Sequence, residues 1–385
     1  MEAGFPDYLC RCGRAHVVSA DRWRCDCGGP LDLPVTAAVW PPRQELHSMW
    51  RHAGSIAGAA ELPWPAISLG EGLTPLVEAG PRLRLKVEYA SATGSFKDRG
   101  AVVLVALAKA LGATRVVADS SGNAGTAVAA YAARAGLAAE IFVPGGTSEK
   151  KVRQIRGHGA EITLVDGSRE DTAAAAAERV ERAGLFYASH VHNPYFLEGT
   201  KTYALEVFEQ LGGAAPDTVV VPAGNGTLVL GAYRGFAALL AAGLVERLPR
   251  IVAVQAERCA PVAAAFDAGQ DQVPAAPPAA TLPEIPAAPP AGTLAEGIAI
   301  AAPARGGQML QAVRESGGTV MTVSEQDILE AHAGLATQGF WVEPTGAVAY
   351  AAVRRLEAMG SPLVERGIVV APLCGSGLKA APPER

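Results

Sequence analysis

The sequence predicts an α/β protein with two three-layer domains and largely parallel sheets, preceded by a small cysteine-bearing segment. Short runs of valine and isoleucine recur along the chain, and helix-like segments separate them. Such runs are typical of strands buried on both faces of a parallel sheet, with helices covering each face. Glycine-rich loops follow several of the runs, and ligands bind beyond the carboxyl ends of such strands.

Composition narrows the class of protein. The chain has 385 residues, a formal net charge of -5, 49% apolar residues and 18% charged residues, which fits a compact enzyme of two or three domains. The mildly acidic balance gives no support for a nucleic-acid partner. An apolar run of about 18 residues, as a membrane span needs, is missing. The N-terminus does not resemble a signal peptide, so we expect a cytoplasmic protein without a membrane partner.

Four of the six cysteines form two pairs, Cys10 with Cys12 and Cys25 with Cys27. Four thiolates can complete a tetrahedral zinc site, and a segment this short needs such a staple to fold. The C-x-C spacing is tighter than the usual C-x-x-C. The alternatives are a ribbon that has lost its metal and one in which His16 replaces a thiol. We predict a structural zinc ion, because four thiolates leave no open position for catalysis.

The expected domains follow these changes in composition. Residues 1–34 form the zinc-ribbon-like segment, 35–90 and 200–385 the large domain, and 91–199 a small α/β domain. Within the large domain, 270–292 holds seven prolines between Pro274 and Pro290. This stretch is expected to be a loop, either a solvated excursion or a flap near a site.

The elements alternate from about residue 80 onward. β-Branched runs predict strands at Leu83–Glu88, Arg115–Ala118, Ala139–Val143, Glu161–Val165, Thr218–Pro222, Arg250–Gln255 and Gly367–Ala371. Alanine- and leucine-rich runs predict helices at Ala101–Leu111, Ala124–Ala135, Lys150–Gly157, Ser168–Ala183, Thr200–Leu211 and Leu228–Ala242. Ser168 is expected to cap its helix.

Lys97 lies between the first strand and the first helix, among small residues. An amine at such a junction can be desolvated at the floor of a cleft and become nucleophilic. Schiff-base chemistry is therefore the first hypothesis, and a surface lysine that starts a helix is the alternative.

Three loops after strands add to this hypothesis. Asp119–Gly125 begins a helix and can bind a carboxylate through its amides. Ala223–Thr227 carries two glycines that let the backbone approach a phosphate, although it matches neither G-x-G-x-x-G nor a Walker A sequence. The third is Leu373–Leu378. Each alone is also a common packing device. With Lys97, the set indicates a pyridoxal 5'-phosphate (PLP) enzyme acting on an amino acid.

Four motifs follow one another in a recognisable order. Glu71–Leu76 fits E-G-x-T-P-L, Thr93–Gly100 matches T-G-S-F-K-D-R-G at every residue, and Ser120–Asn123 fits S-S/T-G-N. Asn193–Thr202 is similar to N-P-x-R-x-E-G-Q-K-T. In these motifs the chain resembles the threonine synthase branch of the tryptophan-synthase-β-like PLP enzymes, which have fold type II and are expected to be homodimers. An N-terminal cysteine ribbon occurs in part of that family.

The resemblance implies the cofactor contacts. Lys97 forms the internal aldimine with PLP and shuttles protons, and Asn123 hydrogen-bonds the 3'-oxygen of the pyridine. Cys374 lies beside the pyridine nitrogen, where a thiol suits elimination and replacement better than transamination; a buried small hydrophobe is the alternative. The amides expected to bind the cofactor phosphate are those of Gly224, Asn225, Gly226, Thr227 and Leu228.

The substrate contacts depart from the family pattern. Ser120, Ser121 and Asn123 are implied to bind the substrate carboxylate. Phe196 stands where the motif has an arginine that grips the phosphate of O-phosphohomoserine, so a bidentate anion clamp is lost. Ala124 replaces a threonine that helps with the same phosphate.

Two histidines, His190 and His192, lie nearby in sequence, and either can replace the lost phosphate contact or simply be packed or solvated. We take His190 as the candidate. The resemblance favours a PLP-dependent lyase or synthase of the threonine synthase type. Phe196 and Ala124 favour a β-eliminating or β-replacing enzyme, such as a serine or threonine dehydratase or a cysteine or cysteate synthase. A non-catalytic relative that senses a ligand has no need for Lys97.

Overall fold

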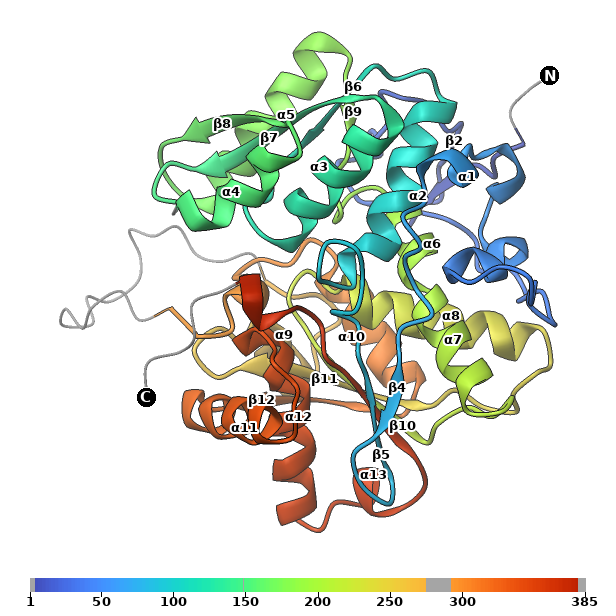
Figure 1. Ribbon diagram of the computed structural model, residues 1–385, viewed down its shortest axis with the longest axis vertical. Helices are drawn as coiled ribbons and strands as arrows, with labels where there is room; N and C mark the ends of the chain where they lie inside the picture. Colours follow the sequence, from blue (N-terminus) through green and yellow to red (C-terminus); the bar gives the residue numbers. More distant parts are fainter. Residues whose placement is uncertain (1–3, 148, 275–291, 380–385) are drawn as a thin grey trace.

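The computed structural model describes residues 4–147, 149–274 and 292–379, which form an α/β fold with three sheets. The four-stranded sheet lies in the upper half of Figure 1 and the six-stranded sheet in the lower half. A small three-stranded sheet belongs to the N-terminal segment. No helix within the described ranges is long and apolar enough to cross a membrane.

The six-stranded sheet has the order β12-β11-β10-β13-β5-β4. Its strands are β4 (Leu76–Glu78), β5 (Leu83–Lys86), β10 (Thr218–Pro222), β11 (Arg250–Ala256), β12 (Thr319–Val323) and β13 (Val369–Pro372). All neighbours are parallel except β4 and β5. Every residue of the central strand β10 is buried, as its valine run predicts.

The four-stranded sheet is entirely parallel and has the order β8-β7-β6-β9. Its strands are β6 (Arg115–Ala118), β7 (Ala138–Pro144), β8 (Glu161–Val165) and β9 (Phe186–Tyr187). The N-terminal strands are β1 (Tyr8–Cys10), β2 (Ala15–His16) and β3 (Leu31–Asp32), paired antiparallel.

Helices connect and cover the sheets. The α-helices are α1 (Trp64–Ile67), α2 (Lys97–Ala110), α3 (Asn123–Ala135), α4 (Glu149–Gly157), α5 (Arg169–Ala183), α6 (Tyr195–Thr200), α7 (Thr202–Gln210), α8 (Thr227–Ala241), α9 (Pro261–Asp267), α10 (Gly306–Glu315), α11 (Glu325–Thr337), α12 (Pro344–Ala358) and α13 (Pro362–Glu365). Short 3-10 turns lie at Met49–Ser55, Ala59–Glu61, Glu296–Ile298 and Gly377–Lys379.

Most predicted elements occur within one or two residues of their expected ends. The Ser168 side chain accepts a hydrogen bond from the Asp171 amide and completes a capping box, as expected. One helix begins earlier than expected, at Lys97 and not at Ala101. The helix expected at Thr200–Leu211 is α7, and the short helix α6 before it was not predicted. The proline-rich stretch lies mostly outside the described residues.

A buried ion cluster holds α2 against the large sheet and α7. Arg99 donates two hydrogen bonds to Glu88, both at 2.7 Å, and two to Glu206, at 2.6 and 2.7 Å. Lys86 Nζ lies 2.9 Å from Glu206. All four side chains are fully buried. The cluster fixes the start of α2, and therefore the position of Lys97, relative to the six-stranded sheet.

The N-terminal segment touches both halves of the molecule. The Trp23 ring packs edge-on against Tyr187 at the end of β9, with ring centroids 5.1 Å apart. On the other side, Asp32 binds Arg234 of α8 at 2.8 Å and Gln308 of α10 at 2.6 Å. The segment therefore bridges elements attached to the two larger sheets.

Candidate active site

A cavity of about 230 Å³ lies at the carboxyl ends of the parallel strands. Its walls come from the loops after β6, β9 and β10, from the first turn of α5, from the segment 297–304 and from the start of α12. Lys97 and Cys374 also line it. The fold therefore brings together chain segments that are more than 200 residues apart.

Lys97 is half-buried at the start of α2. Its amine donates a hydrogen bond to Thr227 Oγ1 at 2.8 Å and lies 4.5 Å from the centroid of the Phe96 ring. Burial lowers the pKa of Lys97 to about 7, against the opposing effects of Cys374 and Glu343. A large fraction of this amine is neutral near pH 7, as a nucleophile requires.

The loop after β10 presents unpaired amides to the cavity. Within the described ranges, no acceptor takes a hydrogen bond from the backbone amides of 224–228. Gly226 has φ +83°, and a Cβ there would lie 2.6 Å from the sulfur of Met309, so only glycine fits. Unpaired amides at the N-terminus of a helix such as α8 are able to bind a phosphate group.

The loop after β6 forms another part of the cavity wall. Ser120, Asn123 and Ala124 line the cavity, whereas the half-buried Ser121 does not. Asn123 Nδ2 donates to both carboxylate oxygens of Glu343, at 2.9 and 3.1 Å. Burial raises the pKa of Glu343, and the Asn123 hydrogen bond opposes that rise.

Cys374 follows β13 and lines the cavity while remaining 3% exposed. Burial raises the pKa of its thiol well above the usual value, and Glu343 acts in the same direction. The side chain is therefore a neutral thiol at physiological pH, which is a weak hydrogen-bonding group and not an anion.

Phe196 does not line the cavity. It is fully buried at the start of α6, and its ring packs edge-on against His190 with centroids 5.8 Å apart. A Cβ on Gly100 would collide with this ring. The Lys97 amine lies 5.6 Å from the Phe196 centroid. Phe196 therefore packs beneath the cavity lining, against His190 and Gly100 and near Lys97.

His190 and His192 both line the cavity. Burial lowers the pKa of His190 well below its usual range, and nearby Lys97 and Arg169 add to the shift. Burial, with Arg305, lowers the pKa of His192 to about 4. Both rings are therefore neutral near pH 7 and supply no positive charge for a substrate anion.

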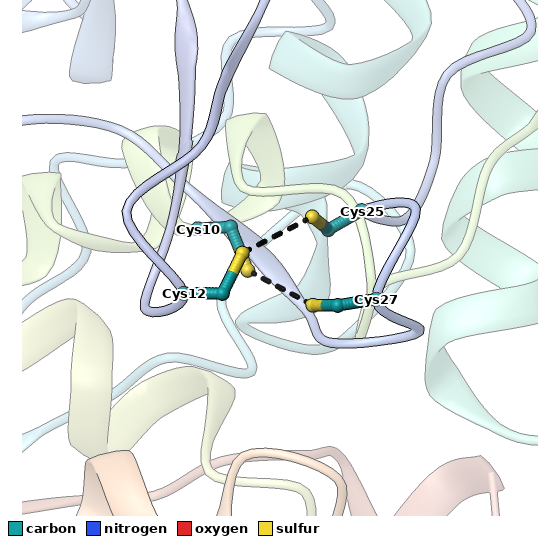
Figure 2. A group of neighbouring side chains, drawn as sticks. All are labelled: Cys10, Cys12, Cys25 and Cys27. Carbon is teal, nitrogen blue, oxygen red and sulfur yellow. Dashed lines mark hydrogen bonds between the residues drawn. The ribbon is translucent and has the colours of Figure 1, made fainter.

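The four cysteines of the N-terminal segment gather at one point (Figure 2). Their sulfur atoms all lie within 4.8 Å of one another. Cys10 is 3.6 Å from Cys27, and Cys12 is 3.6 Å from Cys25. His16 Nε2 lies 3.2 Å from the Cys25 sulfur, at the edge of the cluster. Such a group of thiols can hold a tetrahedral metal ion.

Sequence reasoning missed four charged residues that line the cavity: Asp119, Arg169, Glu170 and Glu343. Asp119 is the first residue of the expected loop Asp119–Gly125, whose amides and not its carboxylate were considered, and Glu343 contacts the expected loop Leu373–Leu378 through Gly375. Arg169 and Glu170 directly follow the predicted cap of α5, but nothing in that helix pattern indicates that its first turn faces Lys97. Their place in the site depends on how the two larger sheets pack.

The chain is similar to known proteins over most of its length. Residues 67–375 match the model of a family described as pyridoxal-phosphate dependent enzyme. A threonine synthase of Methanosarcina acetivorans is 34% identical over 91% of this chain and 86% of its own length. One of Methanocaldococcus jannaschii is 31% identical over 96% and 91%.

Solved structures show the same fold. A threonine deaminase of T.th. is 28% identical, with a TM-score of 0.64, over 80% of this chain and 94% of that one. A threonine deaminase of Solanum lycopersicum, at 21% identity and a TM-score of 0.67, covers 93% of both chains and shows the fold alone. The chain therefore belongs to the pyridoxal-phosphate dependent enzymes and, within them, to the threonine synthase family.

Proposed function

We propose that the cavity holds PLP, with Lys97 at its aldehyde and the amides of 224–228 at its phosphate. The proposal is supported by the lowered pKa of the Lys97 amine and by five amides without a described acceptor. Cys374 would face the pyridine nitrogen as a neutral thiol, and Asn123 would face the 3'-oxygen. When bound, PLP supplies the electron sink that makes the α-proton of an amino acid acidic.

The other residues would bind and orient the substrate. Ser120, Ser121 and Asn123 lie at the N-terminus of α3, where backbone amides and the helix dipole favour the substrate carboxylate. Ser121 does not line the cavity, so Ser120 and Asn123 are the better placed of the three for this contact. The neutral Lys97 amine, held by Thr227 at 2.8 Å, would take and return protons at the substrate carbons.

The reaction would be that of the threonine synthase family. In that reaction a carbon–oxygen bond of the substrate side chain breaks, and the leaving group departs with the bonding electron pair. Water then adds to the neighbouring carbon. The observation that carries this proposal is the Lys97 amine beside the α8 phosphate loop, in a chain whose relatives named threonine synthase match it over most of its length.

A second candidate is β-elimination or β-replacement on serine, threonine or an O-activated amino acid. It is favoured by Phe196, which is buried where the motif has an arginine, and by Ala124, which lacks a hydroxyl. The two candidate reactions use the same Lys97 and the same phosphate loop. They differ in the residues that contact the side chain of the substrate.

The experiment is a substrate screen on the holoenzyme. O-Phosphohomoserine, O-phosphoserine, serine and threonine are each added, and spectral change, phosphate, threonine and keto acid are measured. Threonine and phosphate from O-phosphohomoserine support the first candidate, whereas keto acid from serine supports the second. A protein that binds no PLP and turns over no amino acid contradicts both.

We propose three further features of the protein. The four-cysteine cluster would hold a structural zinc ion, supported by its compact group of sulfur atoms. The large and small domains would divide at about residues 90 and 200, as the two sheets suggest. A homodimer is the expectation from the resemblance, and a cytoplasmic location is the expectation from the N-terminal sequence. Elemental analysis and solution scattering test the metal and the dimer.

A further inference from the structure

Arg169 is an exposed cation that lines the catalytic cavity. It is the first residue of α5, and the capping box of that helix fixes where its side chain begins. Asp171, two residues on, forms no ion pair with Arg169, and its Oδ2 instead accepts hydrogen bonds at 2.7 Å from both the amide and the hydroxyl of Ser168.

The Arg169 guanidinium has no hydrogen bond or ion pair with any residue of the described ranges. Its charge nevertheless reaches the site. It contributes, after burial, to the lowered pKa of Lys97 and of His190. An unpaired guanidinium near the amine at the cavity floor has five donors available for a ligand.

The other charged residues along the cavity do not supply a free, permanent positive charge. Lys97 has a pKa of about 7 and is assigned to the cofactor. Glu343 is engaged by Asn123, and burial raises the pKa of Asp119. Glu170 is exposed next to Arg169 and will weaken, but not cancel, the local positive potential. Among the described residues that line the cavity, Arg169 is the permanent cation.

We propose that Arg169 binds a phosphate ester on the side chain of the amino-acid substrate. This inference rests on the proposed PLP function and deepens it. An arginine on α5 then takes the place of the motif arginine that Phe196 replaces. The substrate would lie with its carboxylate at the Ser120 loop and its phosphate toward α5, and the guanidinium would stabilise the departing phosphate.

The test uses the PLP-loaded enzyme and two unreactive ligands of similar length. One is the phosphonate isostere of O-phosphohomoserine, in which a methylene replaces the ester oxygen. The other is norleucine, whose side chain is neutral. Binding is read from the shift of the visible PLP absorption, so turnover is not needed. The variants are Arg169→Gln and Arg169→Lys, with Arg182→Gln, exposed at the other end of α5, as the matched control.

We expect Arg169→Gln to weaken phosphonate binding by roughly 10- to 100-fold, the usual loss for a charge-assisted contact, and to leave norleucine binding unchanged. Arg169→Lys should fall between, because an ammonium keeps the charge but loses the bidentate geometry. With O-phosphohomoserine as substrate, Arg169→Gln should raise KM by a similar factor. Arg182→Gln should match the wild type.

Three outcomes would overturn the inference. Arg169→Gln can leave phosphonate binding unchanged, or weaken both ligands equally. It can also weaken PLP binding to the cofactor-free protein, which would assign the guanidinium to the cofactor phosphate. A wild-type protein that shows no PLP absorption defeats the proposed function itself, and this result is distinct from the other three.

Discussion

Asn123 and Glu343 meet across the cavity, with Asn123 Nδ2 donating at 2.9 and 3.1 Å to the two carboxylate oxygens. Asn123 begins α3 beside the four-stranded sheet, and Glu343 precedes α12 beside the six-stranded sheet. The contact orients the asparagine amide, and it places a carboxylate where it raises the pKa of Lys97. The Asn123–Glu343 pair therefore affects both the orientation of Asn123 and the protonation of Lys97.

Glu343→Gln tests this coupling. The glutamine keeps an oxygen that accepts from Asn123 but removes the negative charge, so the pKa of Lys97 should fall further below about 7. The measurement is the rate of PLP association with the cofactor-free protein against pH. Its midpoint should move to lower pH in the variant. A midpoint that moves up or stays in place would contradict the electrostatic role.

The wild-type profile follows from Lys97 itself. Its pKa lies near 7, below the usual 10.5, so the amine is protonated below pH 7 and largely neutral above it. Association with PLP should therefore accelerate as pH rises through about 7 and level off above. Lys97→Ala should show no visible PLP absorption and no turnover. An association rate still rising steeply at pH 9 would mean that the amine is not desolvated.

Removing Arg99 should destabilise the fold strongly. Arg99→Leu leaves Glu88 and Glu206 buried without their cation, at a cost of about 3–5 kcal/mol. Urea unfolding measures the loss, and Arg134→Leu at the exposed end of α3 is the control. A loss as small as that of the control would show that the cluster contributes little.

The same cluster predicts acid sensitivity. Burial acts to raise the pKa of Glu206, but Arg99 and Lys86 outweigh it, and the folded-state pKa falls below the usual 4.5. The stabilisation is therefore fully present above about pH 4.5 and is lost as pH falls below that value. Free energies of unfolding between pH 6 and pH 3 measure this, and a Glu206→Gln variant should show a shallower decline over that range.

The cysteine cluster gives a separate prediction. Cys10→Ser should reduce bound zinc in elemental analysis and lower Tm, with a smaller effect on turnover, because the four sulfur atoms lie outside the cavity. Cys259→Ser, outside the cluster, is the control. Wild-type protein without zinc would refute the metal site.

The sequence predicted the elements whose formation depends on neighbouring residues. The valine run of β10, the cap at Ser168 and the glycine-rich loops were recognisable because burial, capping and positive φ each restrict the residue at one position. β12 had no such signal. As an edge strand it is only partly buried, so Thr319–Val323 lacks a continuous apolar run.

For the site too, the residues that belong to local motifs were predicted, and those placed by long-range packing were not. Lys97 and the amides of 224–228 belong to compact motifs, and the structure places them together around one cavity. Arg169 was missed because its contribution depends on the approach of the α5 end to a loop of the other sheet. Phe196 was expected to contact substrate, yet α6 turns it away from the cavity toward Gly100. Such orientations depend on long-range packing.

The contact between Phe196 and Gly100 also restricts how this enzyme can be redesigned. An arginine at position 196 would enter a fully buried space next to the Lys97 amine, where the Phe196 ring already packs closely against Gly100. The clamp of the family motif therefore cannot be reinstalled by one substitution. Directed evolution toward such a clamp first has to change buried residues that do not line the cavity, such as Gly100.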